Sequence, residues 1–531
     1  MSQAFYIEQT PPAKRTDCHQ SDPAAIIKQL YDSETFRLLA QVVVGRLSDH
    51  LEQVQSRNGK VMTARPPRLN LLDARAWLDA ATAATPSDAR TLADRAGTMI
   101  DDLLANSQRL HHPGYIGHQL APPLPLAAVF ELAAALVNQG MAIYELGPWT
   151  TAVEKAMVER LGEQLGFVPG SFSGLVTSGG TLANLTALIA ARNKLLGDAW
   201  SQGLTGLETK PVVITHMESH YSIARAAGII GLGAEQCLYV ASDAAGRTDP
   251  QALADLLDDL KRRAVPVIAV VASAGATRTG SFDPLPAIAD LCEHHGIWLH
   301  VDAAHGGAVS FSKAHRHLIE GIERADSVIW DAHKMLFVPT LSTYLFYKNP
   351  RNKYLAFSQD APFLFVEDSD DAHEFDCGLA TAECTKRAAA LSLWAVMSLY
   401  GGSVYETLID RICEITALFV AKLAAIEQVE MPVEPQFNIV LFRYVPERPD
   451  IDVDAYNKAL RAFIVEDGSL YLTTTTYRGA LYLRFVVMNP LSNETEVEAL
   501  IEALTTFAAR HDGDGDAAFA AERTGQSHLK V

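Results

Sequence analysis

The sequence has little cysteine and shows no pairing pattern among the cysteines it has. Its six cysteines are scattered, without a CxxC pair or the spacing of a zinc site. This argues against a disulfide framework and gives no reason to expect a bound metal. Such cysteine usage fits a reduced setting, so we expect a cytoplasmic protein.

The sequence also shows no stretch typical of a signal peptide and no uninterrupted apolar run of the length of a membrane span. The N-terminal stretch MSQAFYIEQTPPAKR has no apolar core of the kind found in signal peptides. The most apolar stretch, residues 123–144, is interrupted by Glu131, Asn138 and Gln139. We therefore expect a buried helix there and no membrane contact.

The sequence has fewer basic than acidic residues. Lys and Arg number 44 against 63 Asp and Glu, which leaves a net charge of -19 and a pI of about 5.3. An acidic surface repels phosphate backbones and anionic lipids, so nucleic acid is not an expected partner. What remains is the composition of a globular protein, with 48% hydrophobic and 20% charged residues. A length of 531 residues predicts two or three domains.

The periodicity of apolar residues changes along the chain. Residues 1–110 repeat at three- and four-residue spacing, which predicts a helical segment that packs on another domain or on a second subunit. Residues 111–400 alternate short apolar strands with helices, which predicts an α/β domain with a mostly parallel sheet covered on both faces. Residues 401–510 predict a smaller α+β domain, reached through one long helix near 389–426, and residues 511–531 a flexible tail.

Three chemical groups follow predicted strands of the central region. The stretch TSGGTLANL (177–185) places Gly180 and Thr181 between a strand and a helix, where backbone N–H groups favour an anion. The alternative is a tight turn with Thr181 as a helix cap. Asp302 ends the apolar stretch GIWLHVD, and Lys334 follows another in IWDAHKMLF. Ligands of parallel sheets bind at these carboxyl ends.

A phosphorylated pyridine aldehyde requires three groups: a turn that binds an anion, an amine and an acid. Lys334 would form a Schiff base, and the Asp302 carboxylate would keep the ring nitrogen protonated. The alternatives for Asp302 are a metal ligand or a helix N-cap. His220 follows a further strand and could stack on the ring, or be a loop or helix-cap histidine. His333 could contact phosphate or substrate, or be a packed residue at a strand end. The order of these groups in the sequence favours a site for pyridoxal 5'-phosphate. The alternative is that Lys334 is an ordinary surface lysine.

At this point the motifs resemble those of a known family, the pyridoxal-phosphate group II amino-acid decarboxylases, which act on glutamate, cysteine sulfinate, diaminobutyrate or aromatic amino acids. The resemblance spans about residues 100–505. Its motifs are specific for the family and poorly specific for the substrate. They are HHPGYIGH, TSGGTLANL, HYSIARAAG, GATRTGSFDPL, WLHVDAAHGG, RADSVIWDAHKML and LYLRFVVMNP.

The resemblance implies fold type I, a homodimer with shared active sites and an intertwined N-terminal segment, here residues 1–110. It implies that Lys334 binds the cofactor, that Asp302 pairs with the ring nitrogen and that His220 stacks on the ring. Arg484 matches the arginine that holds a substrate carboxylate. His118 borders the substrate in relatives. Further cofactor contacts would come from Gly180, Thr181, Thr277, Ala304 and His333.

Three positions depart from the family pattern. Leu182 stands where the family usually has glutamate, and Asp331 where it commonly has an asparagine that can donate to phosphate. The segment 363–387 has no tyrosine, although in relatives a tyrosine of this loop protonates the intermediate. Asp371 takes its place, and His373 follows two residues later. We hypothesise that His373 is the proton donor, whereas the alternative is that residues 366–376 are only an acidic lid.

These residues predict an enzyme that decarboxylates an L-amino acid to the amine and CO2. We favour an acidic substrate, because His118 could hydrogen-bond a second carboxylate. Its alternative role is that of a structural loop histidine. A decarboxylating aldehyde synthase is the rival enzyme, since loss of the loop tyrosine can divert the reaction. A silent cofactor-binding homologue is a third possibility, against which the intact Lys334 and Asp302 argue.

Overall fold

The computed structural model describes residues 23–62, 65–83, 88–197, 199–357 and 374–511. Contacts divide the chain into two units, residues 1–53 with 63–108, and residues 54–62 with 109–531. In the described part of the chain, no helix has the length and apolar character needed to cross a membrane.

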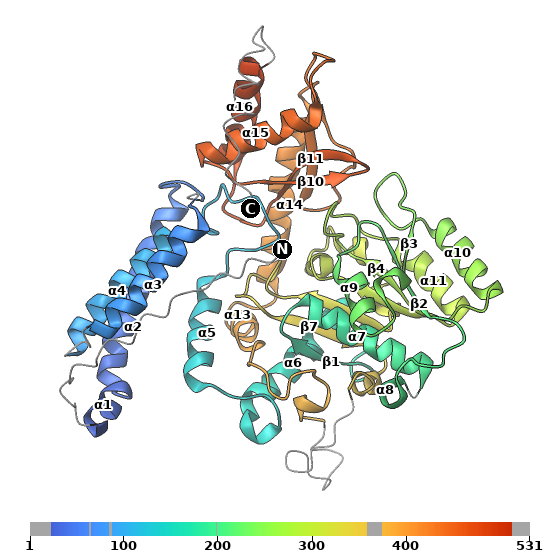
Figure 1. The fold of residues 1–531 in the computed structure, drawn as a ribbon, viewed down its shortest axis with the longest axis horizontal. Helices are drawn as coiled ribbons and strands as arrows, with labels where there is room; N and C mark the ends of the chain where they lie inside the picture. Colours follow the sequence, from blue (N-terminus) through green and yellow to red (C-terminus); the bar gives the residue numbers. More distant parts are fainter. Residues whose placement is uncertain (1–22, 63–64, 84–87, 198, 358–373, 512–531) are drawn as a thin grey trace, which may run out of the picture. The chain divides into compact units, whose positions relative to one another are not determined.

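The first unit is helical in its described residues (Figure 1). The Asp88 side chain accepts a hydrogen bond from the Thr91 N–H and begins the fourth helix. Gly97 of that helix lies so close to the second that a Cβ there would meet Val42 at 3.1 Å. The helices are α1 (Pro23–Leu30), α2 (Ser33–Gln55), α3 (Pro67–Ala83) and α4 (Ala89–Ala105).

The second unit contains a seven-stranded sheet with the order β1-β7-β6-β5-β4-β2-β3. Pairing is parallel from β3 through β2, β4 and β5 to β6, whereas β7 runs antiparallel to both β6 and β1. The strands are β1 (Ser173–Thr177), β2 (Val212–His216), β3 (Cys237–Val240), β4 (Val267–Ser273), β5 (Trp298–Asp302), β6 (Ser327–Asp331) and β7 (Thr343–Tyr347).

Apolar cores cover both faces of this sheet. In β4, Val270 and Ala272 belong to one buried cluster, whereas Ala269 and Val271 belong to the other. The alternation follows from the two-residue period of a strand, and burial on both sides explains the unbroken apolar run. The helices of this region are α5 (Pro125–Val137), α6 (Pro148–Leu165), α7 (Gly180–Leu196), α8 (Ala199–Gln202), α9 (Ser222–Ile229), α10 (Pro250–Arg262) and α11 (Leu285–His295).

Short 3-10 helices complete the connections in the described residues. They are η1 (Tyr144–Leu146), η2 (Ala234–Gln236), η3 (Gly306–Phe311), η4 (Arg316–Ile319), η5 (Ile322–Arg324), η6 (Pro350–Tyr354) and η7 (Cys377–Leu379).

The C-terminal part of this unit contains a second, antiparallel sheet with the order β10-β11-β9-β8. Figure 1 labels two of its strands, β10 and β11. Its strands are β8 (Val429–Glu430), β9 (Ile439–Tyr444), β10 (Thr473–Tyr477) and β11 (Ala480–Val486), and its helices are α15 (Val453–Asp467) and α16 (Glu494–His511).

The prediction of one long helix near residues 389–426 is wrong. The structure has two helices there, α13 (Leu391–Tyr400) and α14 (Ser403–Ala424). Gly401 has a φ of 79° and donates its N–H to the Met397 carbonyl, which ends α13. The left-handed conformation suits glycine and stops the helix, although the apolar periodicity continues on both sides.

Candidate active site

The carboxyl ends of four strands meet at one edge of the seven-stranded sheet. Thr343 of the antiparallel β7 pairs with Thr177, the last residue of β1, and with Asp331, the last residue of β6. Ser273, the last residue of β4, pairs with Asp302, the last residue of β5. Polar side chains distant in the sequence therefore meet where ligands of parallel sheets bind.

A cavity of about 360 Å³ opens at this edge. Its volume lies within the range typical of small-molecule sites, about 300–1,000 Å³. It is lined by Ser178, Gly179, Gly180, Thr181, Asn184, His220, Tyr221, Ser273, Gly275, Ala276, Thr277, Asp302, Ala304, His305, Ile329, Asp331, His333, Lys334 and Leu341.

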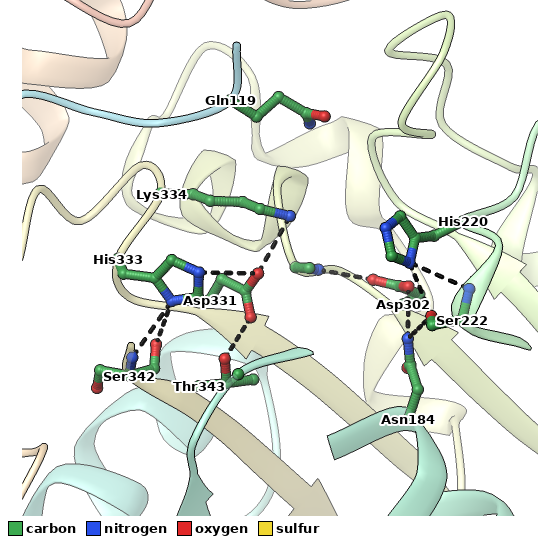
Figure 2. A network of polar contacts seen from close by, with 12 residues as sticks. Gln119, Asn184, His220, Ser222, Asp302, Asp331, His333, Lys334, Ser342 and Thr343 are labelled. Atoms are coloured by element: carbon green, nitrogen blue, oxygen red, sulfur yellow. Dashed lines mark hydrogen bonds and ion pairs between the residues drawn. The ribbon is translucent and has the colours of Figure 1, made fainter. Parts of the chain in front are cut away.

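Lys334 lies on one side of the cavity in an ion pair. Its Nζ is 3.1 Å from Oδ2 of the buried Asp331, which also accepts a hydrogen bond from the Thr343 hydroxyl. His333 places Nε2 3.6 Å from the same carboxylate oxygen and Nδ1 2.9 Å from the Ser342 carbonyl (Figure 2). Burial alone would raise the pKa of Asp331, but Lys334 and His333 hold it below its ordinary value.

Asp302 lies on the other side, oriented by two donors (Figure 2). Its Oδ2 accepts from Asn184 Nδ2 at 2.9 Å, and its Oδ1 from the Ala304 N–H at 3.1 Å. Asn184 also donates to Ser222 Oγ at 3.0 Å and places Oδ1 2.8 Å from His300 Nε2. An ionised carboxylate accepts about four hydrogen bonds, so Asp302 retains capacity for a further donor in the cavity.

His220 lies beside Asp302 with a defined tautomer. The Ser222 N–H lies 3.3 Å from His220 Nδ1, so this nitrogen is an acceptor, and the Ser222 hydroxyl donates to it at 2.8 Å. The proton of the neutral ring is therefore on Nε2. Burial lowers the pKa of His220, although the Asp302 carboxylate opposes the shift. A neutral ring suits stacking on a flat ligand.

A second cavity, of about 330 Å³, shares His220, Tyr221 and Thr277 with the first and contains Arg484 of β11. The Arg484 side chain is buried, and burial lowers its pKa to about 10. Among the described residues, no carboxylate forms an ion pair with it. Its donors reach neutral oxygen atoms of Thr277 (2.7 Å), Gln119 (3.2 Å), Arg278 (3.3 Å) and Gly117 (3.5 Å).

Two polar side chains of one loop also border this second cavity. His118 places Nε2 3.3 Å from the Tyr471 hydroxyl, and burial, together with the charge of Arg484, lowers its pKa. The Nε2 amide of Gln119 is buried and has no hydrogen-bond partner among the described residues. A buried donor without a partner costs free energy unless a ligand accepts from it.

The structure gathers most of the residues singled out in the sequence. Gly180, Thr181, His220, Thr277, Asp302, Ala304, His333 and Lys334 line the first cavity, and His118 and Arg484 line the second. Their roles stay predictions. Asp371 and His373 lie outside the described residues, and so the proposed proton donor stays a prediction as well.

Sequence reasoning missed several residues of the site. Asn184 lies within a motif already noted, one helical turn after Gly180, and this spacing could have indicated that it faces the strand ends. His305 is buried in the cavity wall, where its Nε2 lies 2.7 Å from Asn438 and burial lowers its pKa to about 3. No local pattern indicates its role, because its partner comes from the distant β8–β9 connection.

The residues present fit the expected cofactor. Lys334 supplies an amine, Asp302 a carboxylate with free accepting capacity, and the first turn of α7 backbone N–H groups for an anion. Gly179, with a φ of 113°, lets the backbone approach such an anion without a side chain.

Comparisons with known proteins agree with this geometry. The family model described as the pyridoxal-dependent decarboxylase conserved domain matches residues 114–445. An acidic amino acid decarboxylase of Bos taurus is 28% identical over 91% of this chain and 92% of its own length. An L-2,4-diaminobutyrate decarboxylase of Rhizobium meliloti (strain 1021) is 33% identical over 76% and 79%. The crystal structure of mouse CSAD has a TM-score of 0.80 at 28% identity, covering 92% of this chain and 99% of its own, which confirms the expected fold class.

Proposed function

This chain belongs to the family of pyridoxal-dependent decarboxylases, and we propose that its substrate is an acidic L-amino acid held by Arg484. It is a carboxy-lyase that uses pyridoxal phosphate to decarboxylate an amino acid. One observation carries the choice of substrate. Arg484 is 7% exposed, and within the described residues its guanidinium donates only to neutral oxygen atoms. A buried cation of this kind calls for an anionic ligand.

The relatives act by name on substrates of opposite side-chain charge, acidic amino acids and diaminobutyrate. The charges of the second cavity favour the acidic class. Arg278 and Glu218 form an ion pair at 2.8 Å, so their charges offset each other. Arg484 then leaves one net positive charge in the cavity, which attracts a second carboxylate and repels a side-chain ammonium. The Gln119 amide is a further donor for that carboxylate.

Each group at the first cavity has a distinct task in the proposed mechanism. Lys334 would hold the cofactor through its amine, which the substrate amine can replace. Asp302, oriented by Asn184, would hold a proton on the ring nitrogen, and His220 and Ala304, which also line the cavity, would pack against the ring. Gly180 and Thr181 in the first turn of α7 would hold the phosphate, with His333 and Thr277 as further cofactor contacts.

Pyridoxal phosphate supplies the electron sink that accepts the bonding pair when CO2 leaves. The chain then has to return a proton to the carbon that lost the carboxylate. We retain the hypothesis that His373 of a partner subunit performs this step, because its unperturbed pKa of about 6.5 suits proton donation near neutral pH. The His373→Phe variant should form less amine and more aldehyde and peroxide. Amine formation at the parent rate without peroxide would exclude this role.

A second candidate function rests on the absence of tyrosine from residues 363–387. Without an efficient proton donor the reaction can consume oxygen and give an aldehyde. Scoring CO2, amine, aldehyde and peroxide from the parent enzyme separates the two functions. Amine as the main product supports the decarboxylase, whereas aldehyde with peroxide supports an aldehyde synthase.

The substrate class is tested with a panel of acidic, neutral, basic and aromatic L-amino acids. We expect the highest kcat/KM for an acidic one. Arg484→Gln should lower that value by about 10²-fold, since hydrogen bonds to a charged group are worth about 1.5–3 kcal/mol each. Arg484→Lys keeps the charge but loses the planar fork, so an intermediate loss is expected. A basic or aromatic amino acid as best substrate, or an equal loss for all substrates in Arg484→Gln, would contradict the proposal.

We further propose a cytoplasmic homodimer with shared active sites. The five cysteines within the described residues are free, which suits a reduced compartment. Exposed apolar side chains around Trp149 support the dimer.

A further inference from the structure

Asp331 is an acid inside the part of the cavity that is suited to an anion. Its side chain is buried, and its carboxylate lies against Gly180, the first residue of α7. A Cβ at Gly180 would meet Oδ1 at 3.1 Å and Oδ2 at 3.3 Å. The carboxylate therefore occupies the neighbourhood of the helix N-terminus, where the partial positive charge of the helix is greatest.

The surroundings of Asp331 keep it ionised. The Lys334 ammonium lies 3.1 Å from Oδ2, His333 Nε2 lies 3.6 Å from the same atom, and the Thr343 hydroxyl donates to Oδ1. His220 and His305 are the other titratable groups whose electrostatic interaction with Asp331 is resolved. An incoming phosphate meets a negative charge that an asparagine at this position would not carry.

This charge opposes binding in two ways that can be separated. It repels a phosphate placed at the start of α7, because like charges in a poorly hydrated site interact strongly. It also binds the Lys334 amine in an ion pair, whereas covalent capture of an aldehyde needs that amine to leave the pair. The first effect depends on the phosphate of the ligand, and the second does not.

We propose that Asp331 acts as a competing anion in the phosphate site and so weakens the capture of any phosphate-bearing aldehyde by this enzyme. The inference rests on the proposed placement of the cofactor phosphate at the start of α7. On this proposal, the charge of Asp331 lowers the affinity of the enzyme for the cofactor. The fraction of enzyme molecules that hold cofactor therefore depends on the cofactor concentration.

The test compares the parent full-length chain, freed of cofactor, with Asp331→Asn. Three ligands are titrated, namely pyridoxal phosphate, pyridoxal, which lacks the phosphate, and inorganic phosphate, which lacks the aldehyde. We expect the variant to lower the Kd of pyridoxal phosphate and of inorganic phosphate by about tenfold or more, and that of pyridoxal by less than about threefold. The first two ligands are followed by absorbance, and phosphate by its shift of the unfolding temperature.

Asp302→Asn is the matched control, because it makes the same acid-to-amide change in the same cavity, at a carboxylate that binds Asn184, one helical turn beyond the start of α7. It should not tighten the binding of inorganic phosphate. Thermal unfolding checks that each variant folds, and Asp331→Ser, neutral and smaller, replaces the asparagine variant if that one fails to fold.

An unchanged or higher Kd for pyridoxal phosphate in a folded neutral variant would overturn the proposal. So would an equal gain for pyridoxal, since the charge would then act on Lys334 alone. Failure of the proposed function has a different signature. If borohydride fixes the cofactor to a lysine other than Lys334, the proposed active site itself is wrong. If the cofactor is fixed to Lys334 but the Kd of inorganic phosphate is unchanged in Asp331→Asn, only the role of Asp331 is rejected.

Discussion

At the residue scale, the proposed mechanism depends most on the charge of Asp302. Its two oxygens accept separately from Asn184 and from the Ala304 N–H, so an asparagine, with one oxygen and one NH2 group, keeps one of these bonds and loses the other. Asp302→Asn preserves the size of the side chain and should fold, but it should lose the charge proposed to hold the ring proton. We expect turnover to fall by about 10²-fold or more. The measurement is kcat at saturating cofactor, with cofactor occupancy read by absorbance. Near-normal turnover at full occupancy would refute the assignment.

Single residues also show what the sequence could predict. Asp302 and Lys334 could be placed at strand ends because each follows an apolar stretch typical of a buried strand. Two features could not be predicted. They are the ion pair between Lys334 and Asp331 and the Gln119 amide that has no hydrogen-bond partner among the described residues. These depend on side-chain directions and on contacts between segments far apart in the chain.

At the element scale, Asn184 joins α7, α9 and β5. Its amide donates to Ser222 and Asp302, and its oxygen lies 2.8 Å from His300 Nε2. Asn184→Ala removes one hydrogen-bond partner from each of these groups, so we expect a loss of unfolding free energy of about 2 kcal/mol or more, together with a shifted absorbance of the bound cofactor. Chemical denaturation and absorbance spectra test both.

The matched control for this change is Thr186→Val on the same helix. The Thr186 hydroxyl is buried and donates to the Leu182 carbonyl of its own helix. It should leave the cofactor spectrum unchanged. A spectrum shifted equally by both variants would mean that α7 packing in general, and not the bridge made by Asn184, orients Asp302.

The elements themselves were largely predictable, whereas their order in the sheet was not. The apolar stretches that lead to Asp302 and Lys334 correspond to β5 and β6. The place of β1 does not follow chain order, since it lies at the edge of the sheet beside β7. The meeting of Thr177 and Asp331 at Thr343 depends on that order. The break at Gly401 escaped prediction because apolar periodicity continues through it.

At the scale of the whole molecule, an exposed apolar cluster supports the proposed homodimer. Trp394 of α13 contacts Phe130 of α5 and Trp149 of α6, with ring centroids 6.5 and 6.1 Å apart. Trp149 is 64% exposed, and Leu136 of α5 is 65% exposed. Contiguous apolar surface of this kind marks protein interfaces, and a second copy of the chain is the expected partner.

The dimer is tested by sedimentation at assay concentration. We expect the parent chain to be dimeric and Trp149→Glu to dissociate and lose activity, because a charge in an apolar interface is costly. Val168→Glu is the matched control, since Val168 is 66% exposed and makes no ring contact with this cluster. A fully active parent monomer would contradict the shared active site.

The most direct test of the central claim is to reduce the parent enzyme with borohydride in the presence of pyridoxal phosphate and to map the labelled peptide. We expect the cofactor mass on Lys334 and its absence in Lys334→Ala, in which no amine remains beside Asp331 and within reach of Asp302. A cofactor mass on any other lysine of the parent enzyme, or on none, would contradict the placement of the active site at this sheet edge.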